Sequence, residues 1–239
     1  MELKLGKRLS AIADLVEGKT LIDIGTDHGK LPVKLLLNGT IQYAIATDLN
    51  PLPLQKAIET AKQFGTYDKM EFIQASGLEL EDSVIDKSDT IVIAGMGGEL
   101  IAEILEKSKK EIIVGKKIIV QPMSRVEFFH EWIYKNGFGI LEEYAIEENG
   151  KYYLVLALEY TAQHLTITER EKFIGKLNAK QSSGYILRRL RKTREKLMEM
   201  EKAEREKGIV NEKSSLKEAI LSFAEIEQML TEIKENVDR

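Results

Sequence analysis

In Leu21-Ile22-Asp23-Ile24-Gly25-Thr26-Asp27-His28-Gly29, a short apolar run stops at glycines and a helix-like segment follows. The same pattern recurs in Ile91-Val92-Ile93-Ala94-Gly95-Met96-Gly97-Gly98. Ligands of an open parallel sheet bind just outside the carboxyl ends of its strands. Because Asp48 closes a third strand between the two glycine-bearing ends, we expect a small-molecule site there.

Strand-like and helix-like runs alternate from residue 20 to residue 136, and this alternation predicts βαβ units around a parallel sheet. The expected strands are Thr20–Ile24, Tyr43–Asp48, Met70–Ala75, Thr90–Ala94 and Lys117–Gln121, and the clearest helices are Pro53–Phe64, Glu99–Lys109 and Arg125–Asn136. Asn149-Gly150 then joins two further strand-like runs, which is a strong hairpin signal. The fold class that we predict is α/β, with a Rossmann-like sheet that ends in an antiparallel hairpin.

The C-terminal part of the chain has a different pattern, because strand signals and prolines disappear from Thr166 onward. Apolar residues recur there every three or four positions, which predicts two long helices over about 168–207 and 214–237. Such a pair fits an antiparallel, coiled-coil-like helical hairpin. We therefore expect a Rossmann-like domain over residues 1–162 and an α-helical domain over residues 163–239.

Composition narrows the classes of function. The 239 residues carry a formal net charge of −4, which argues against a uniformly basic nucleic-acid binder. There is no cysteine, so disulfides, thiolate zinc sites and cysteine nucleophiles are excluded, and the three histidines are too scattered for us to expect a metal site. No apolar run has the form of a signal peptide or the length of a membrane span. We expect a soluble cytoplasmic protein, with a monomer favoured.

The first glycine turn does not fit dinucleotide binding. A Gly-x-Gly-x-x-Gly fingerprint started at Gly25 would place its second glycine on Asp27 and its third on Lys30. A carboxylate at Asp27 would repel a pyrophosphate but attract a sulfonium or ammonium cation. With Asp23 before it and Gly29 after it, the turn resembles motif I of class I S-adenosylmethionine (SAM) methyltransferases. An ordinary strand-to-helix turn explains the same residues equally well.

The neighbouring strand ends supply further candidates for a nucleoside cofactor. Asp48, with Leu49 beside it, can accept hydrogen bonds from both ribose hydroxyls, although a carboxylate here could instead cap the following helix. Ser76 and Gly77, after the third strand, would flank the adenine, and a plain loop explains them nearly as well. The expected cofactor site is completed by Ala94, Gly95 and Met96.

Five motifs occur together along the chain: Arg8-Leu9, Gly25-x-Asp27-His28-Gly29-x-Leu31-Pro32, Ala46-Thr47-Asp48-x-Asn50, Ala94-Gly95-Met96-Gly97-Gly98 and Gln121-Pro122. In combination they resemble the TrmK family of bacterial tRNA (adenine-N1) methyltransferases, over the whole chain. The resemblance implies SAM as cofactor and adenosine 22 of tRNA as substrate, and it implies substrate contacts from Arg8, Gly97, Gly98, Gln121 and Pro122. The family commonly has Gln-Pro-Asn where this chain has Gln121-Pro122-Met123.

This resemblance also suggests how the reaction would proceed. Adenine N1 carries a free lone pair, so it can attack the SAM methyl group directly, and catalysis is mostly positioning. Because the product base is cationic, Asp27 is our candidate for stabilising that charge or accepting an N6 proton, with His28 orienting it. Asp27 could instead cap its own turn or contact the methionine amino group of the cofactor.

A dense basic run lies in the C-terminal part. Residues 170–196 hold ten basic and two acidic side chains, a net charge of +8. We expect Arg188, Arg189 and Arg191 to contact tRNA phosphates, which would make binding salt-sensitive, whereas a solvated helix face is the alternative. Two other functions remain open at this point: a non-catalytic nucleotide-binding module whose helical hairpin docks a protein, and a SAM methyltransferase of small molecules.

Overall fold

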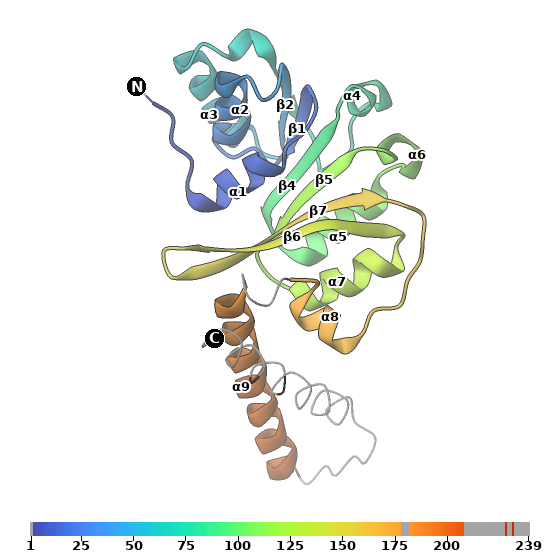
Figure 1. Ribbon diagram of the computed structural model, residues 1–239. Helices are drawn as coiled ribbons and strands as arrows, with labels where there is room; N and C mark the ends of the chain where they lie inside the picture. Colours follow the sequence, from blue (N-terminus) through green and yellow to red (C-terminus); the bar gives the residue numbers. More distant parts are fainter. Residues whose placement is uncertain (1, 178–181, 208–227, 229–230, 232–239) are drawn as a thin grey trace. The chain divides into compact units, whose positions relative to one another are not determined.

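The computed structural model describes residues 2–177, 182–207, 228 and 231 (Figure 1). The chain divides into two compact units, Met1–Thr166 and Ile167–Arg239. The boundary follows Thr166, four residues after the position expected from the sequence. Each unit is described separately below.

The first unit is built on a mixed sheet of seven strands among the described residues, in the order β3-β2-β1-β4-β5-β7-β6. The strands are β1 (Thr20–Ile24), β2 (Tyr43–Asp48), β3 (Met70–Gln74), β4 (Thr90–Met96), β5 (Lys117–Pro122), β6 (Phe138–Glu148) and β7 (Lys151–Tyr160). The first five strands are parallel, whereas β7 pairs antiparallel with both β5 and β6. The predicted Rossmann-like sheet ending in an antiparallel hairpin is therefore confirmed.

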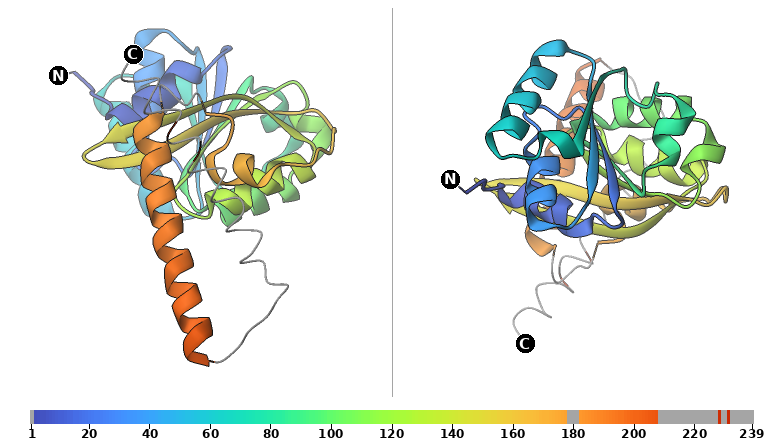
Figure 2. Two further views of the ribbon diagram at one scale, coloured as in Figure 1. Left: turned by 60° about the horizontal axis from the view of Figure 1, so that its bottom comes forward. Right: turned by 90° about the horizontal axis from the view of Figure 1, so that it is seen from above.

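Helices cover both faces of this sheet (Figure 2). They are α1 (Lys7–Leu15), α2 (Lys30–Asn38), α3 (Pro51–Gln63), α4 (Asp82–Asp86), α5 (Gly98–Lys107), α6 (Lys110–Ile113) and α7 (Val126–Lys135), with a 3₁₀ turn at Tyr67–Lys69. Leu21, Val92 and Ile119 point from the strands into a buried core against α1, α2 and α3. Burial of such side chains contributes about 1.5–3 kcal/mol each to stability, so this layer holds the carboxyl ends of the strands in place.

The register of the hairpin carries its tip past the end of β5. β6 and β7 pair along their whole length, from Phe138 opposite Tyr160 to Glu148 opposite Lys151. β7 pairs with β5 only from Leu156 to Leu158. Because β7 runs antiparallel to β5 and Leu156 pairs with Val120, the residues of β7 before 154 continue beyond the carboxyl end of β5 at Pro122. The turn of the hairpin therefore lies at the same edge of the sheet as the glycine-bearing strand ends.

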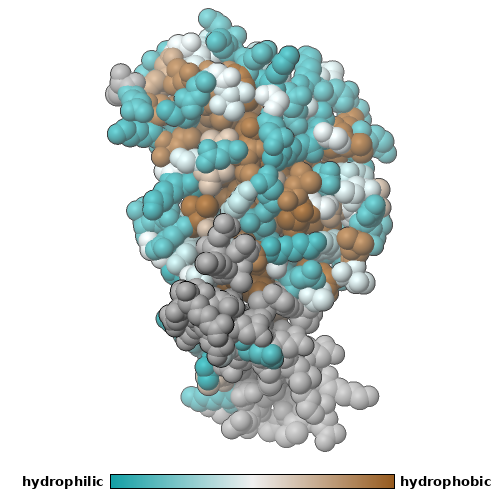
Figure 3. All heavy atoms as spheres, in the orientation of Figure 1, coloured by the Kyte–Doolittle hydropathy of each residue, from teal (hydrophilic) through white to brown (hydrophobic). Residues whose placement is uncertain are grey.

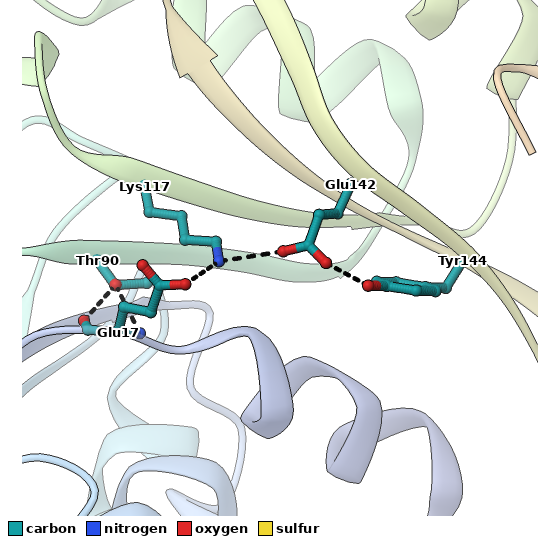
Figure 4. Close-up of polar contacts among 5 residues, drawn as sticks. All are labelled: Glu17, Thr90, Lys117, Glu142 and Tyr144. Carbon is teal, nitrogen blue, oxygen red and sulfur yellow. Dashed lines mark hydrogen bonds and ion pairs between the residues drawn. The ribbon is translucent and has the colours of Figure 1, made fainter.

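A polar network at the opposite edge of the sheet fixes the hairpin and the segment after α1 (Figure 4). Lys117 Nζ lies 2.6 Å from Glu17 Oε1 and 3.4 Å from Glu142 Oε1. Tyr144 donates a hydrogen bond to Glu142, and the Thr90 hydroxyl donates to the Glu17 carbonyl at 2.6 Å. The network thus joins β4, β5 and β6 to the loop that leads from α1 into β1.

The face of the first unit that is visible in Figure 3 mixes hydrophilic and hydrophobic side chains. Several large apolar side chains are exposed, among them Leu49 and Leu52 beside the end of β2. Within the described part of the chain, no helix combines the length and the apolar character that crossing a bilayer requires.

The second unit contains α8 (Glu169–Ile174) and α9 (Ser183–Lys207) among its described residues. The single helix expected over 168–207 is therefore wrong, because Gly175 ends α8 with a φ of 67°. α8 begins with a capping box, in which Thr168 and Glu171 satisfy each other's backbone N–H groups. The second expected helix, 214–237, lies outside the described residues except for positions 228 and 231.

Candidate active site

A cavity of about 520 Å³ opens at the carboxyl ends of β1, β2 and β4. This volume falls within the range of about 300–1,000 Å³ that is common for small-ligand sites. The cavity is lined by Arg8, Leu9, Asp23, Gly25, Thr26, Asp27, His28, Lys30, Leu31, Asp48, Ala94, Gly95, Met96, Met123, Glu148 and Tyr153. The strand ends that the sequence singles out are thus brought together in one hollow.

Asp23, near the end of β1, is a buried carboxyl in the wall of this cavity. Burial, aided by the nearby charge of Asp48, raises its pKa to about 6, although the hydrogen bond from Thr26 acts to lower it. The Thr26 hydroxyl donates to Asp23 Oδ2 at 2.7 Å. The backbone N–H groups of Gly25 and Thr26 both donate to the Thr47 carbonyl, which ties the turn to β2. The cavity therefore carries a desolvated acid that a cation would stabilise in its charged form.

The two glycines of this turn are required for different reasons. Gly25 has a φ of 73°, and a Cβ at this position would overlap the terminal methyl of Met96 across the cavity. Gly29 has a φ of 64°, and its Cβ would lie 2.9 Å from that of Ala57 in α3. Gly25 therefore keeps the cavity open, whereas Gly29 allows α2 and α3 to pack closely.

Asp48 lies two residues before the N-cap of α3, which is Asn50, so Asp48 is not the cap residue itself. Its Oδ1 accepts the backbone N–H of Asn50 at 2.8 Å, at the entry to α3. The side chain of Asn50, at the N-cap position, makes no capping hydrogen bond. Since the second oxygen of Asp48 has no partner among the described residues, it can accept hydroxyl groups of a ligand.

Asp27 and His28 lie at the mouth of the cavity. Asp27 has a φ of 40°, an unusual value for a residue other than glycine. Its Oδ1 lies 3.6 Å from His28 Nε2, and its side chain is 80% exposed. Solvent screens such a pair strongly, so Asp27 has little electrostatic effect until a ligand covers it.

Arg8, from α1, forms the opposite wall. Its NH1 donates to Gln121 Oε1 at 2.7 Å, and its guanidinium lies 5.7 Å from the centre of the Tyr153 ring. A Cβ on Gly95 would lie 3.9 Å from the same NH1. Arg8 is thus held in front of the end of β4, with its remaining N–H donors available to the cavity.

Gln121 is fully buried and does not line the cavity. Besides accepting from Arg8, its amide group donates to the Pro122 carbonyl at 3.1 Å and to Met123 Sδ at 3.3 Å. Both ends of the side chain are therefore occupied. Gln121 is therefore a positioning residue for Arg8. Met123, which stands where the family commonly has asparagine, accepts a hydrogen bond from Gln121 through its sulfur.

The structure does not bring every predicted cofactor residue to the cavity. Ser76 lines a separate small hollow beside α5, and a Cβ on Gly77 would meet the side chain of Ile104 at 2.8 Å. Leu49 is 62% exposed, and its carbonyl accepts a hydrogen bond from Gln74. Asp23, Gly25, Asp48, Ala94, Gly95 and Met96 do line the cavity, whereas Gly29 packs behind it.

Of the residues predicted to contact substrate, some line the cavity and others do not. Arg8 lines the cavity, whereas Gly97, Gly98, Gln121 and Pro122 do not. Gly98 is buried at the start of α5, where a Cβ would lie 2.9 Å from the carbonyl oxygens of Ser124 and Arg125. Its lack of a side chain therefore lets the end of β5 pass close to α5.

Other lining residues are absent from the sequence prediction. They are Leu9, Thr26, Lys30, Leu31, Met123, Glu148 and Tyr153. Leu9, Thr26, Lys30, Leu31 and Met123 adjoin or fall inside the quoted motifs, so the sequence places them near the predicted site. Glu148 and Tyr153 flank the hairpin turn, and only the strand order and register place them at this edge.

The basic run over residues 170–196 begins on α8, and the three arginines predicted to contact phosphates lie on α9. The side chains of Arg188, Arg191, Lys192 and Arg194 are exposed. Arg189 is half-buried, and its Nε and NH2 lie 3.4 and 3.3 Å from the Phe173 carbonyl of α8. Arg189 therefore joins α8 to α9.

Potential metal ligands do not gather in the described part of the chain. No group of three or more His, Cys, Asp or Glu side chains there could hold a metal ion.

Comparison with known proteins identifies the class. A family model described as a methyltransferase domain matches residues 5–156. The tRNA (adenine(22)-N(1))-methyltransferase of Bacillus subtilis (strain 168) is 38% identical over 161 residues, which are 66% of this chain and 66% of that protein. The crystal structure of the B. subtilis m1A22 tRNA methyltransferase TrmK has 29% identity and a TM-score of 0.76, covering 97% of this chain and 99% of that one.

A putative tRNA (m1A22) methyltransferase of Streptococcus pneumoniae, solved in complex with S-adenosyl-L-methionine, has 30% identity and a TM-score of 0.76, covering 93% of this chain and 99% of that one. The fold, the cavity and the matched model define a Rossmann-like methyltransferase. Within that class, the chain belongs to the TrmK family. The family and the type of enzyme predicted from the sequence are thereby confirmed.

Proposed function

We propose that this chain is a SAM-dependent methyltransferase that methylates N1 of adenosine 22 in tRNA. The observation that supports this best is the two-sided cavity, with three aspartates at the ends of β1 and β2 and Arg8 across from them. The TrmK relatives act on that nucleotide by name, and one was solved with SAM.

The residues at the ends of β1 and β2 fit SAM chemically. SAM carries an ammonium and a sulfonium cation, and Asp23 offers a carboxylate to them. The unpartnered oxygen of Asp48 suits the ribose hydroxyls. When bound, SAM supplies an electrophilic methyl group. The open backbone at Gly95, in front of Arg8, leaves room for a flat base beside that methyl group.

The protein's part in the reaction is to position the base. N1 lies on the Watson–Crick edge of adenine, so the base must be unpaired before it enters the cavity. Arg8, held by Gln121, donates to acceptor atoms of the nucleotide and fixes its orientation. Because N1 has its own lone pair, no metal is needed. We also propose that the enzyme is cytoplasmic and acts as a monomer.

Asp27 is assigned to the positive charge that develops on the base. Covering by the ligand removes the water that screens this carboxylate, and its effect on a cation then grows. Asp27→Asn should slow methyl transfer about tenfold while the SAM dissociation constant changes little. The measurement is the single-turnover rate at saturating SAM. An unchanged rate would remove Asp27 from the charge role, and loss of SAM binding would reassign it to the methionine amino group.

The exposed arginines of α9 are assigned to tRNA phosphates. Each contact releases counterions, so the double variant Arg188→Gln/Arg191→Gln should reduce the slope of log K against log salt by about 1.4–1.8. Filter binding of tRNA between 50 and 200 mM salt measures this slope. Glu195→Gln/Glu199→Gln, on the same helix, is the matched control and should leave the slope unchanged or steeper. An unaltered slope in the arginine variant would make this face a solvated surface.

The function itself is tested by incubating the full chain with labelled SAM and unmodified tRNA and mapping the methyl group by reverse-transcription stops. A stop at position 22, absent from tRNA with guanosine at that position, is expected. Binding of SAM without transfer to any tRNA would contradict the proposal and favour a non-catalytic module. Transfer only to small molecules would favour the other alternative.

A further inference from the structure

We propose that Glu148 is a substrate-recognition residue, which accepts a hydrogen bond from the exocyclic N6 amino group of the target adenine. This inference rests on the proposed function. It concerns the hairpin wall of the cavity, to which the sequence assigned no role.

The hairpin places Glu148 at the base-binding side of the cavity. Glu148 ends β6, two residues before the glycine of the turn, and it lines the same hollow as Tyr153 and Arg8. It lies beyond the carboxyl end of β5, since the paired part of β7 begins only at Leu156. Arg8, in turn, stands in front of Gly95 at the end of β4. The carboxylate therefore faces the space that we assign to the base.

The carboxylate of Glu148 is only partly satisfied by the protein. Its Oε1 accepts the backbone N–H of Arg8 at a long distance of 3.4 Å, in the first turn of α1. Among the described residues this N–H is its one hydrogen-bonding partner, so Oε2 has none. Gly6, at the N-cap of α1, gives the carboxylate space, because a Cβ there would overlap Oε1. The start of a helix also favours a negative charge at this point.

Adenine offers a donor at C6, whereas guanine offers an acceptor there. A carboxylate accepts only, so it binds the adenine amino group and repels guanine O6. In the methyl transfer, the N1 lone pair forms the new N–C bond and the S–C bond breaks, with its electrons going to sulfur. The positive charge thus passes from sulfur to the base and spreads to N6, and no proton moves. A carboxylate at N6 therefore binds the transition state more strongly than the substrate.

A competing explanation is that Glu148 merely caps α1. A chemical double-mutant cycle separates the two. Wild type and Glu148→Gln are compared on tRNA with adenosine at position 22 and on tRNA with purine riboside there, which lacks the amino group. The variant should lower kcat/KM for adenosine about 10- to 100-fold. It should change the rate on purine riboside less than about twofold, with SAM affinity unchanged.

Glu147→Gln is the matched control, because Glu147 is exposed and does not line the cavity. It should leave both rates as in wild type. Equal losses on both substrates in Glu148→Gln, or a lowered melting temperature with no substrate dependence, would overturn the inference in favour of the cap. Failure of the wild-type chain to methylate the adenosine tRNA would instead overturn the proposed function, before any variant is compared.

Discussion

Arg8→Ala is expected to lower kcat by about 10²- to 10³-fold and to leave SAM affinity nearly unchanged. Removing one pre-oriented donor from a catalytic site typically costs this much. Arg8 is such a donor, because Gln121 holds its NH1 at 2.7 Å and the ring of Tyr153 lies under its guanidinium. The aspartates that we assign to SAM lie at the ends of β1 and β2, across the cavity from Arg8. Cofactor binding therefore does not depend on the Arg8 side chain.

Single-turnover rates and SAM titrations on the same preparations measure both quantities. Arg8→Lys keeps the charge but not the planar fork, so it should remain impaired. Lys7→Ala is the control, since Lys7 is exposed and adjacent. A loss that appeared only in SAM affinity, with normal transfer once SAM is bound, would contradict the assignment of Arg8 to the base.

Substitution of Gln121 tests whether this residue positions Arg8. If Gln121 acts through Arg8, Gln121→Leu should lower the rate of methyl transfer in the otherwise wild-type enzyme. In an enzyme that already carries Arg8→Ala, it should lower that rate little further. Residues that act as one unit show such non-additivity. Additive losses would mean that Gln121 has a role independent of Arg8.

The half of the site that lies on β1 and β2 could be predicted because its determinants are local. Asp23, Gly25 and Asp48 each end or follow a strand whose apolar run is readable in the sequence, and a parallel sheet brings such ends together. The other half depends on topology. Glu148 and Tyr153 reach the cavity only because β7 inserts between β5 and β6 and its register carries the turn past β5.

Two further departures have local causes. The expected helix over 168–207 is interrupted at Gly175, which has a positive φ of 67° and ends α8. Glycine costs about 1 kcal/mol in a helix interior relative to alanine, so its presence favours a break there. The sequence predicts that Gly97 and Gly98, like Gly95, contact a ligand. The structure gives Gly98 a packing role against Ser124, which no spacing of glycines could distinguish.

Asp23 is expected to give protein stability and SAM affinity opposite dependences on pH. Its pKa in the folded protein is raised to about 6, from 3.8. Between these values the folded state holds a proton that the unfolded chain has lost. The free energy of unfolding therefore falls as pH rises through this window, by about 3 kcal/mol in total. The cofactor cations favour the carboxylate instead, so SAM affinity should rise about tenfold from pH 5 to pH 7 and then level off.

Asp23→Asn isolates this contribution from other titrating groups. Asparagine can still accept the Thr26 hydroxyl but stays neutral at every pH. The variant should melt higher than wild type at pH 8, bind SAM more weakly, and lose the rise in affinity between pH 5 and pH 7. Asp14→Asn, an exposed aspartate on α1, is the control for the change in net charge. Thermal melts and SAM titrations at each pH provide the data. A wild-type affinity that stays flat from pH 5 to pH 7 would show that Asp23 does not face the cofactor's positive charge.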